Sequence, residues 1–204
     1  MTDAIRPMRK DDAKAVAELH RLRIAAGFLS SLGPAFLRQI YAAIPSCPSG
    51  FGYVRDEGDG EVVGFIACAE STGRLYRQAL LRRGLRMALP LARFIIRPSV
   101  IRRVWETLRY PSRAPASLPA AEMLSMAVAA GAARKGIGKA LMTAALQEFA
   151  RRGITRVKLA VGGNNPAAAR FYVDCGYRLA LQTTHHGLPM DIYVFDGADA
   201  DRTA

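Results

Sequence analysis

Three glycines and three basic residues separate a strand-like run from a helix-like run in MAVAAGAARKGIGKALM, residues 126–142. When a strand runs into a helix through glycines, several unpaired backbone N–H groups meet the partly positive end of the helix dipole. Such a site binds anions, most often phosphate groups. Gly136 and Gly138 let the backbone approach a ligand without an intervening Cβ. Three charged side chains add to the attraction: Arg134, Lys135 and Lys139.

Two common phosphate-binding motifs do not match this loop. The P-loop requires GxxxxGK followed by Ser or Thr, and Gly131 and Gly136 have the right spacing, but Ile137 occupies the lysine position. The dinucleotide fingerprint requires GxGxxG, and Gly136 and Gly138 fit, but Leu141 stands in place of the last glycine. The loop therefore belongs to another class of phosphate site.

Residues 133–138, Ala-Arg-Lys-Gly-Ile-Gly, resemble the acetyl-coenzyme A (acetyl-CoA) loop of the GNAT superfamily of N-acetyltransferases. The signature of that loop is Arg or Gln, two variable residues, Gly, one variable residue, then Gly or Ala. Ala133 stands where the family has Arg or Gln, and Arg134 can substitute for that phosphate contact from the next position. The backbone contacts of the loop do not depend on this side chain.

The second half of the chain strengthens the resemblance. GNAT proteins commonly carry N-x-x-A, an aromatic pair and a Gly-aromatic strand start. The same order and spacing occur here in Asn165, Ala168, Phe171, Tyr172, Gly176 and Tyr177. The N-terminal IRPMRKDDAKAVAEL is similar to the family's first strand and helix, so the resemblance covers about residues 1–70 and 120–196.

The resemblance implies transfer of an acetyl group from acetyl-CoA to an amine by direct attack in a ternary complex. The amine, with a pKa of about 10, must lose a proton, and the leaving thiolate, with a pKa of about 8.5, benefits from an acid. The thioester oxygen gains charge and needs a hydrogen-bond donor. In the family the fourth strand splays from the fifth, so a free N–H of Met126 or Val128 would polarise the carbonyl. Tyr172 matches the tyrosine that often protonates the sulfur.

Two carboxylates are candidates for the general base. Glu122 matches a glutamate that acts through water in some relatives, and Glu70 ends the third strand. Asn165 matches the asparagine that contacts the cofactor arm. The resemblance thus implies ten cofactor-binding residues: Met126, Val128, Arg134, Lys135, Gly136, Ile137, Gly138, Lys139, Asn165 and Tyr172.

Several of these residues have a plainer interpretation. Tyr172 would simply pack its helix against the sheet, and Glu122 would be a solvated charge at the start of a strand. Cys175 lies close to the expected cofactor, but small buried cysteines are common structural residues. His185 and His186 either border the acceptor pocket or form a solvated hairpin tip.

The order of hydrophobic patterns predicts an α/β protein with a mixed sheet and helices on its faces, in one domain over residues 1–204. Strands are expected at 4–8, 51–56, 61–70, 121–129, 155–161, 177–184 and 190–196. Helices are expected after Asp11 and Asp12 as N-cap, from Pro34 to about Ile44, from Gly136 to Arg152 and from Pro166 to Cys175.

A basic helical insertion, residues 73–118, is expected between the third and fourth strands. Eleven arginines and one acidic residue lie between Gly73 and Arg113, so this segment carries +10 of the net charge of +12. Pro90 and Pro98 divide it into pieces. Apolar residues recur in it at roughly helical intervals: Leu75, Leu80, Met87 and Leu91. The insertion would be a lid over the acceptor, a dimer contact, a surface for anionic partners or a solvated surface.

Composition narrows the classes of protein to which this sequence can belong. The three cysteines are odd in number and lack metal-ligand spacing, so we expect reduced thiols, no metal site and a cytoplasmic protein. Neither a secretory signal nor a membrane-spanning run is evident. An arginine-rich lid suits a phosphorylated or carboxylated small acceptor, such as a sugar nucleotide, and relatives often form homodimers. The alternative function is a protein that binds nucleic acid or anionic membrane through its basic helices.

Overall fold

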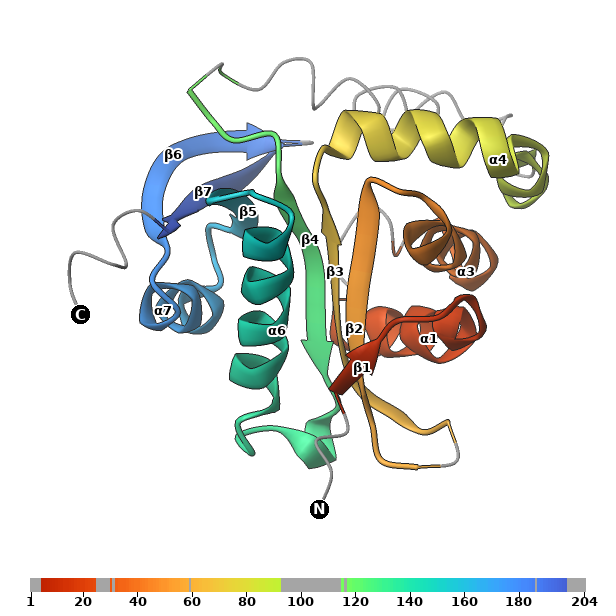
Figure 1. Ribbon diagram of the computed structural model, residues 1–204, viewed down its shortest axis with the longest axis horizontal. Helices are drawn as coiled ribbons and strands as arrows, with labels where there is room; N and C mark the ends of the chain where they lie inside the picture. Colours follow the sequence, from red (N-terminus) through yellow and green to blue (C-terminus); the bar gives the residue numbers. More distant parts are fainter. Residues whose placement is uncertain are drawn as a thin grey trace.

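The computed structural model describes residues 5–24, 30, 32–58, 60–92, 115, 117–185 and 187–197. In this part of the chain a seven-stranded sheet has the order β1-β2-β3-β4-β5-β7-β6 (Figure 1). The strands are β1 (Ile5–Pro7), β2 (Gly50–Asp56), β3 (Val62–Ala69), β4 (Glu122–Val128), β5 (Arg156–Gly162), β6 (Arg178–His185) and β7 (Leu188–Asp196). All seven lie within a few residues of the predicted strands.

Strands β4 and β5 are the parallel pair in an otherwise antiparallel sheet. Their pairing covers only Glu122 with Lys158 and Met123 with Leu159. Beyond these residues the two strands separate, so the rest of β4 faces β5 without a ladder of hydrogen bonds. The splay implied by the family resemblance is therefore present.

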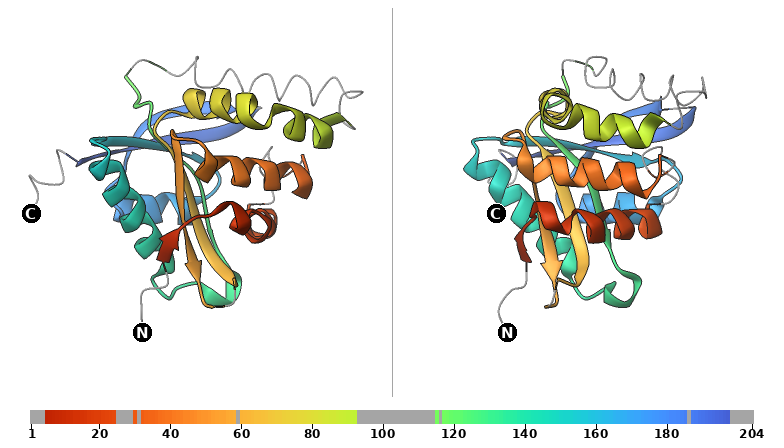
Figure 2. Two further views of the ribbon diagram at one scale, coloured as in Figure 1. Left: turned by 45° about the vertical axis from the view of Figure 1, so that its right-hand side comes forward. Right: turned by 90° about the vertical axis from the view of Figure 1, so that its right-hand side faces the viewer.

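Helices cover both faces of the sheet (Figure 2). On one face α3 (Pro34–Ala43) packs between α1 (Ala13–Arg23) and α4 (Thr72–Ala92), and on the other lie α6 (Ile137–Arg151) and α7 (Pro166–Asp174). Short 3₁₀ turns are η1 (Lys10–Asp12), η2 (Ile44–Ser46) and η3 (Ala130–Ala132). Among the described helices, none is long and apolar enough to cross a lipid bilayer.

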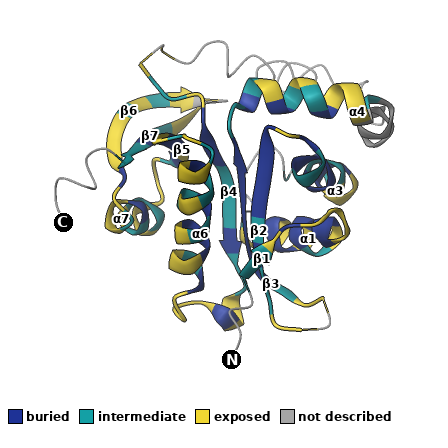
Figure 3. Cartoon of the chain, viewed as in Figure 1, coloured by how far each residue is buried: buried dark blue, intermediate teal, exposed yellow. Residues whose placement is uncertain are grey.

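The core has two layers, one under each set of helices. Because side chains of a strand alternate between faces, β3 supplies Phe65 and Ala67 to the layer under α1 and α3, and Ile66 and Cys68 to the layer under α6. All four side chains are fully buried. The central strands are correspondingly dark, whereas β6 is largely exposed (Figure 3).

The start of α1 differs from the prediction. Asp12 is the N-cap residue, but its side chain makes no capping hydrogen bond. Its two carboxylate oxygens instead accept hydrogen bonds at 2.8 Å from both Nη atoms of Arg6, and one oxygen also accepts from the Arg9 N–H. A bidentate pair with arginine provides two charge-assisted hydrogen bonds in place of one capping bond, so the carboxylate binds a tertiary partner.

The insertion begins as predicted but is divided differently. Helix α4 continues through Pro90 to Ala92, so Pro90 does not divide it. Among its described residues, Leu75 and Ala79, four residues apart, are buried apolar side chains, whereas Leu80 is 64% exposed. A five-residue step places Leu80 on a different face from Leu75, which is why the predicted stripe is not one face. The predicted break at Pro98 lies outside the described residues.

Candidate active site

The glycine loop forms the start of α6. Gly136 is the N-cap, with φ 78°, and Gly138 is the second residue of the helix, where the sequence predicts them. Arg134 also has a positive φ of 62°, which is uncommon for a residue with a side chain. Within the described chain, the N–H groups of residues 134–139 have no hydrogen-bond acceptor. Free N–H groups gathered at a helix N-terminus form an anion site.

The side chains of this loop fit a diphosphate. Arg134, Lys135 and Lys139 are exposed and leave the backbone accessible, while Ile137 is buried and anchors the first turn of α6 in the core. Ile137 can therefore contribute only its backbone N–H to a ligand. Backbone donors at a helix N-terminus, together with nearby cations, are the groups that a phosphate site requires.

The splayed part of β4 presents free backbone groups beside this loop. The Ala129 N–H donates to the Val63 carbonyl on β3, and alternate residues of a strand direct their backbone groups to opposite sides. The N–H groups of Met126 and Val128 are therefore directed away from β3, toward the unpaired side of β4 that faces β5. These are the two N–H groups that the family resemblance implies as donors to a thioester oxygen.

Helix α7 places Tyr172 and Asn165 on the same side of the sheet as α6. Tyr172 is 9% exposed, and burial, with smaller contributions from the thiols of Cys175 and Cys68, raises its pKa. The phenol is therefore protonated at neutral pH, as a proton donor must be. The Asn165 side chain accepts a hydrogen bond from the Ala168 N–H and caps α7. Its carboxamide oxygen thus has a structural partner, and its NH₂ group is the part available to a ligand.

Glu122 is not the solvated charge of the plainer interpretation. Its side chain is buried and accepts a hydrogen bond from the Thr72 hydroxyl at 2.6 Å, with the Lys158 Nζ at 3.7 Å. Burial raises the pKa of this carboxyl, and the Lys158 charge and the Thr72 bond partly oppose the shift. Glu122 thus lies in a buried polar cluster at the point where β4 and β5 separate.

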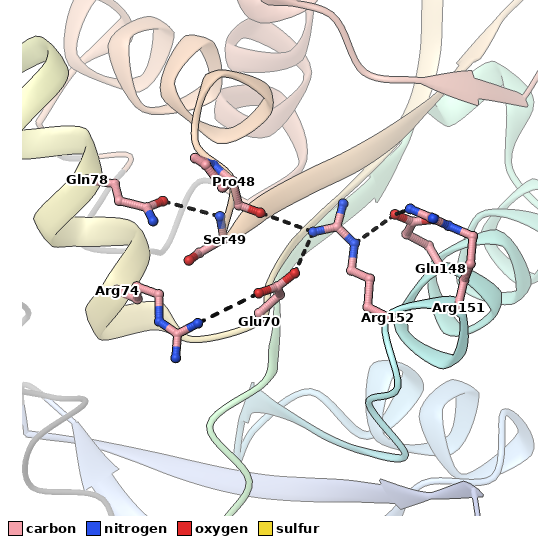
Figure 4. Close-up of polar contacts among 8 residues, drawn as sticks. All are labelled: Pro48, Ser49, Glu70, Arg74, Gln78, Glu148, Arg151 and Arg152. Carbon is pink, nitrogen blue, oxygen red and sulfur yellow. Dashed lines mark hydrogen bonds and ion pairs between the residues drawn. The ribbon is translucent and has the colours of Figure 1, made fainter.

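Glu70 lies in a different cluster, which ties the end of α6 to the sheet and α4 (Figure 4). Its carboxylate accepts a hydrogen bond from Arg152 at 2.7 Å and has Arg74 at 4.0 Å. Arg152 also donates to Glu148 at 2.7 Å and stacks on the Phe51 ring. The structure therefore separates the two candidate bases by their partners: Glu122 pairs with Lys158, and Glu70 pairs with arginines.

The hydrogen bonds of Glu148 with Arg151 and Arg152 predict that the fold loses part of its stability at low pH. Hydrogen bonds from Arg151, and then from Arg152, lower the pKa of Glu148 from 4.5 to about 2. Because the folded-state pKa is depressed, this carboxylate stabilises the fold above pH 4.5 and loses that contribution as the pH falls through about 2. Glu148→Gln should therefore be less stable than the native chain at neutral pH.

The measurement is urea unfolding of both chains at several pH values. The difference in free energy of unfolding should narrow steadily below pH 4.5. A difference that is the same at pH 3 and pH 7 would contradict the ion-pair explanation.

The chain matches the acetyltransferase (GNAT) family over residues 16–177. The chain belongs to the GNAT family of acetyltransferases. Its acyl donor is acetyl-CoA, and the glycine loop, the splayed strand and α7 all lie within the matched region. Among curated proteins, a sequence comparison finds no match.

Solved structures share the fold of this GNAT acetyltransferase at low sequence identity. SsHAT has a TM-score of 0.69 and 23% identity, over 95% of this chain and 98% of that chain. NAA60 from Arabidopsis thaliana, in complex with acetyl-CoA, has a TM-score of 0.59 and 14% identity, over 94% and 97%. The ribosomal-protein-S18-alanine N-acetyltransferase from Escherichia coli has a TM-score of 0.58 and 15% identity, over 94% and 92%.

The site also contains residues that sequence reasoning missed. Thr72 and Lys158 hold Glu122, and Arg152 holds Glu70, across sequence separations of 50, 36 and 82 residues. Lys158 alternates with apolar residues in its strand, so the pattern gave no sign that its side chain is buried. A buried lysine next to a buried glutamate becomes evident only when β4 and β5 pair.

Proposed function

We propose that this GNAT acetyltransferase moves an acetyl group from acetyl-CoA to a primary amine of a small acceptor, by direct attack in a ternary complex. The observation that carries the proposal is the row of free N–H groups at residues 134–139, next to the unpaired side of β4. The first feature binds a diphosphate, and the second offers a hydrogen-bond donor to the thioester oxygen.

The residues of the site divide the proton transfers. Tyr172 supplies a proton to the leaving thiolate, because its buried phenol is neutral at the working pH. Glu122 is our preferred base, acting through water, because its raised pKa brings it closer to the range in which a carboxylate can accept a proton. Glu70 is the weaker candidate because its carboxylate already has two arginine partners.

An anionic acceptor, such as a phosphorylated or carboxylated small molecule, is favoured by the position and charge of the insertion. Helix α4 starts three residues after β3 and contributes Thr72 to the Glu122 cluster, and the exposed side chain of Arg77 follows within two turns. Arg82 is less suited to this role because its guanidinium donates to the Ser46 carbonyl oxygen. A cytoplasmic location and a homodimer are part of the same proposal.

The proposal is tested in two steps. Thermal shift with acetyl-CoA and with CoA measures donor binding, and a panel of amines is then followed by release of free thiol. Both acetyl-CoA and CoA should raise Tm, and at least one amine, with phosphate- or carboxylate-bearing amines among the best, should accelerate thiol release from acetyl-CoA. Binding without turnover on any amine would leave the transferase step unsupported.

Tyr172→Phe should lower kcat about 100-fold while changing the KM for acetyl-CoA little, because general acid catalysis contributes about 10²–10⁴-fold to rate. Tyr177→Phe is the matched control, since Tyr177 is buried in the same cluster and its hydroxyl donates to the Met142 sulfur at 3.8 Å. Equal kcat values in the two variants would show that Tyr172 has only a packing role.

A further inference from the structure

Three buried or half-buried polar side chains from three separate elements form a hydrogen-bonded chain. The His20 Nδ1 on α1 lies 2.5 Å from the Tyr41 hydroxyl on α3, which lies 2.9 Å from the Ser125 Oγ on β4. These residues are 21 and 84 positions apart in sequence. The chain crosses the otherwise apolar layer between the sheet and the two helices, where polar groups are costly unless they are satisfied.

The His20 end of this hydrogen-bonded chain is uncharged. His20 is 3% exposed, its ring lies over Phe65, and burial lowers its pKa to about 4. No imidazolium cation therefore forms at His20 at neutral pH, so the hydrogen-bonded chain does not store a proton taken from the amine substrate. A neutral chain can instead fix the direction in which each hydroxyl points.

The unpartnered nitrogen of His20 decides that direction. The Nε2 is buried, and no hydrogen-bond partner for it is found among the described residues. A buried N–H without an acceptor is rarer in proteins than an acceptor without a donor, so the proton belongs on Nδ1. Nδ1–H then donates to the Tyr41 oxygen, Tyr41 O–H donates to the Ser125 Oγ, and the Ser125 hydrogen remains for another acceptor. In the described chain no such acceptor is found for it.

Ser125 lies beside the proposed thioester site. The β3–β4 register shifts from Cys68–Met123 to Ala67–Ser125, so Leu124 is bulged and Ser125 follows the last residue that pairs with β5 by two positions. The next N–H along the chain, that of Met126, is directed toward the open side of β4. Two donors adjacent in sequence, the Ser125 hydroxyl and the Met126 N–H, therefore lie at the start of the splay.

We propose that the Ser125 hydroxyl donates a hydrogen bond to the thioester carbonyl oxygen of acetyl-CoA, and that Tyr41 and His20 are positioning residues that hold it in the donating orientation. The inference rests on the proposed acetyl-CoA function. No covalent bond forms or breaks in this chain: it supplies a preorganised donor where negative charge develops, in addition to the backbone N–H. Burial also raises the pKa of Tyr41, so its phenol keeps the proton that it donates to Ser125.

The test compares two ligands that differ at the carbonyl. Acetyl-CoA has the oxygen, and S-ethyl-CoA, a thioether of the same length, lacks it. Ser125→Ala should raise the Kd for acetyl-CoA about 3–10-fold, the range of one net hydrogen bond, and leave the Kd for S-ethyl-CoA unchanged. With any amine that turns over, the same variant should lower kcat about 10–100-fold, and Ser125→Thr, which keeps the hydroxyl, should recover most of the loss.

Tyr41→Phe tests the positioning role. It should raise the Kd for acetyl-CoA by a smaller factor than Ser125→Ala, and should add nothing in the Ser125→Ala background, because it acts through that hydroxyl. Imidazole nitrogen NMR of the unliganded protein should show the His20 proton on Nδ1. Ser46→Ala is the control: this hydroxyl donates to the Ala42 carbonyl within the chain, and its loss should leave both Kd values unchanged.

Each outcome separates the inference from the proposed function. If native protein binds neither ligand, the acetyl-CoA function fails. If native protein binds both but Ser125→Ala changes the two Kd values equally, or changes neither, the hydroxyl is not a donor to the carbonyl. A lower Tm with unchanged binding in Tyr41→Phe would mean that the chain only joins α1 and α3 to the sheet, and a proton on Nε2 would overturn the donor direction.

Discussion

Gly138→Asp should raise the Kd for acetyl-CoA by roughly 100-fold or more. The new carboxylate would lie in the first turn of α6, among the free N–H groups that we propose bind the diphosphate. Two like charges about 4 Å apart repel by about 4 kcal/mol at an effective dielectric constant of 20, which accounts for a loss of this size. The measurement is calorimetric titration with acetyl-CoA.

The fold should tolerate this substitution. A Cβ at Gly138 would lie 3.5 Å from the Phe171 ring, an ordinary contact, and an acidic residue near a helix N-terminus stabilises the helix. The Tm of the unliganded variant should therefore be equal to or above that of the native chain. Lost binding combined with a much lower Tm would mean unfolding rather than repulsion.

Gly131→Asp is the matched control for charge. Gly131 lies in η3 of the same loop, a Cβ there would meet no atom within 4 Å, and the residue is exposed. The two variants have the same net charge, but Gly131 lies outside the row of free N–H groups. A similar Kd for both variants would show that the diphosphate does not lie at the start of α6.

Lys158→Met should destabilise the fold by about 3–5 kcal/mol at pH 8, because breaking a buried ion pair leaves an uncompensated charge. Lys158 is buried on β5, donates to the Pro119 carbonyl at 2.6 Å and faces Glu122 at 3.7 Å. Methionine matches the apolar stem but supplies no charge. Urea unfolding measures the change, and Lys14→Met, at an exposed position of α1, should change the free energy of unfolding by less than about 0.5 kcal/mol.

The pH dependence of this loss follows from Glu122. Burial raises its folded-state pKa above 4.5, so the folded state binds the proton more tightly, and stability falls as the pH rises from 4.5 through the folded pKa. Removing Lys158 removes a charge that lowers the pKa of Glu122. The pH range over which stability falls therefore extends to higher pH. The Lys158→Met variant should therefore lose less stability at pH 5 than at pH 8.

A double variant checks the cause. Glu122→Gln combined with Lys158→Met removes both charges and keeps a polar partner for the Thr72 hydroxyl, so it should recover most of the stability lost in Lys158→Met. A double variant as unstable as Lys158→Met at pH 8 would show that lost packing of the lysine stem, not a stranded carboxylate, is responsible.

The Gly138→Asp and Lys158→Met predictions concern two features, the glycine loop and the buried Glu122–Lys158 pair, that differ in how readily the sequence reveals them. The glycine loop could be located from the sequence because its signals are local: Gly136 takes a positive φ, and the free N–H groups follow from the start of any helix. The buried pair could not, because Glu122 and Lys158 are neighbours only through the pairing of β4 with β5. The loop that we propose for the cofactor was therefore easier to locate from the sequence than the partners of the buried carboxylates.

The sequence by itself determined the order of strands and helices, the family resemblance, and the position of the glycine loop at the start of α6. Pro34 and Pro166 start their helices as predicted, because proline at the first helical position lacks only an N–H that has no partner there. These features depend on backbone preferences and on the periodicity of apolar residues within one segment, and neither needs contacts from elsewhere in the chain.

Only the tertiary structure decided which polar side chains meet. The Asp12 side chain binds Arg6 instead of capping α1. Glu122 is buried rather than solvated, and Glu70 pairs with Arg152. The His20–Tyr41–Ser125 chain likewise requires two helices and a bulged strand to come together. Such contacts join residues distant in sequence, so they follow from strand register and helix packing, which a local pattern does not specify.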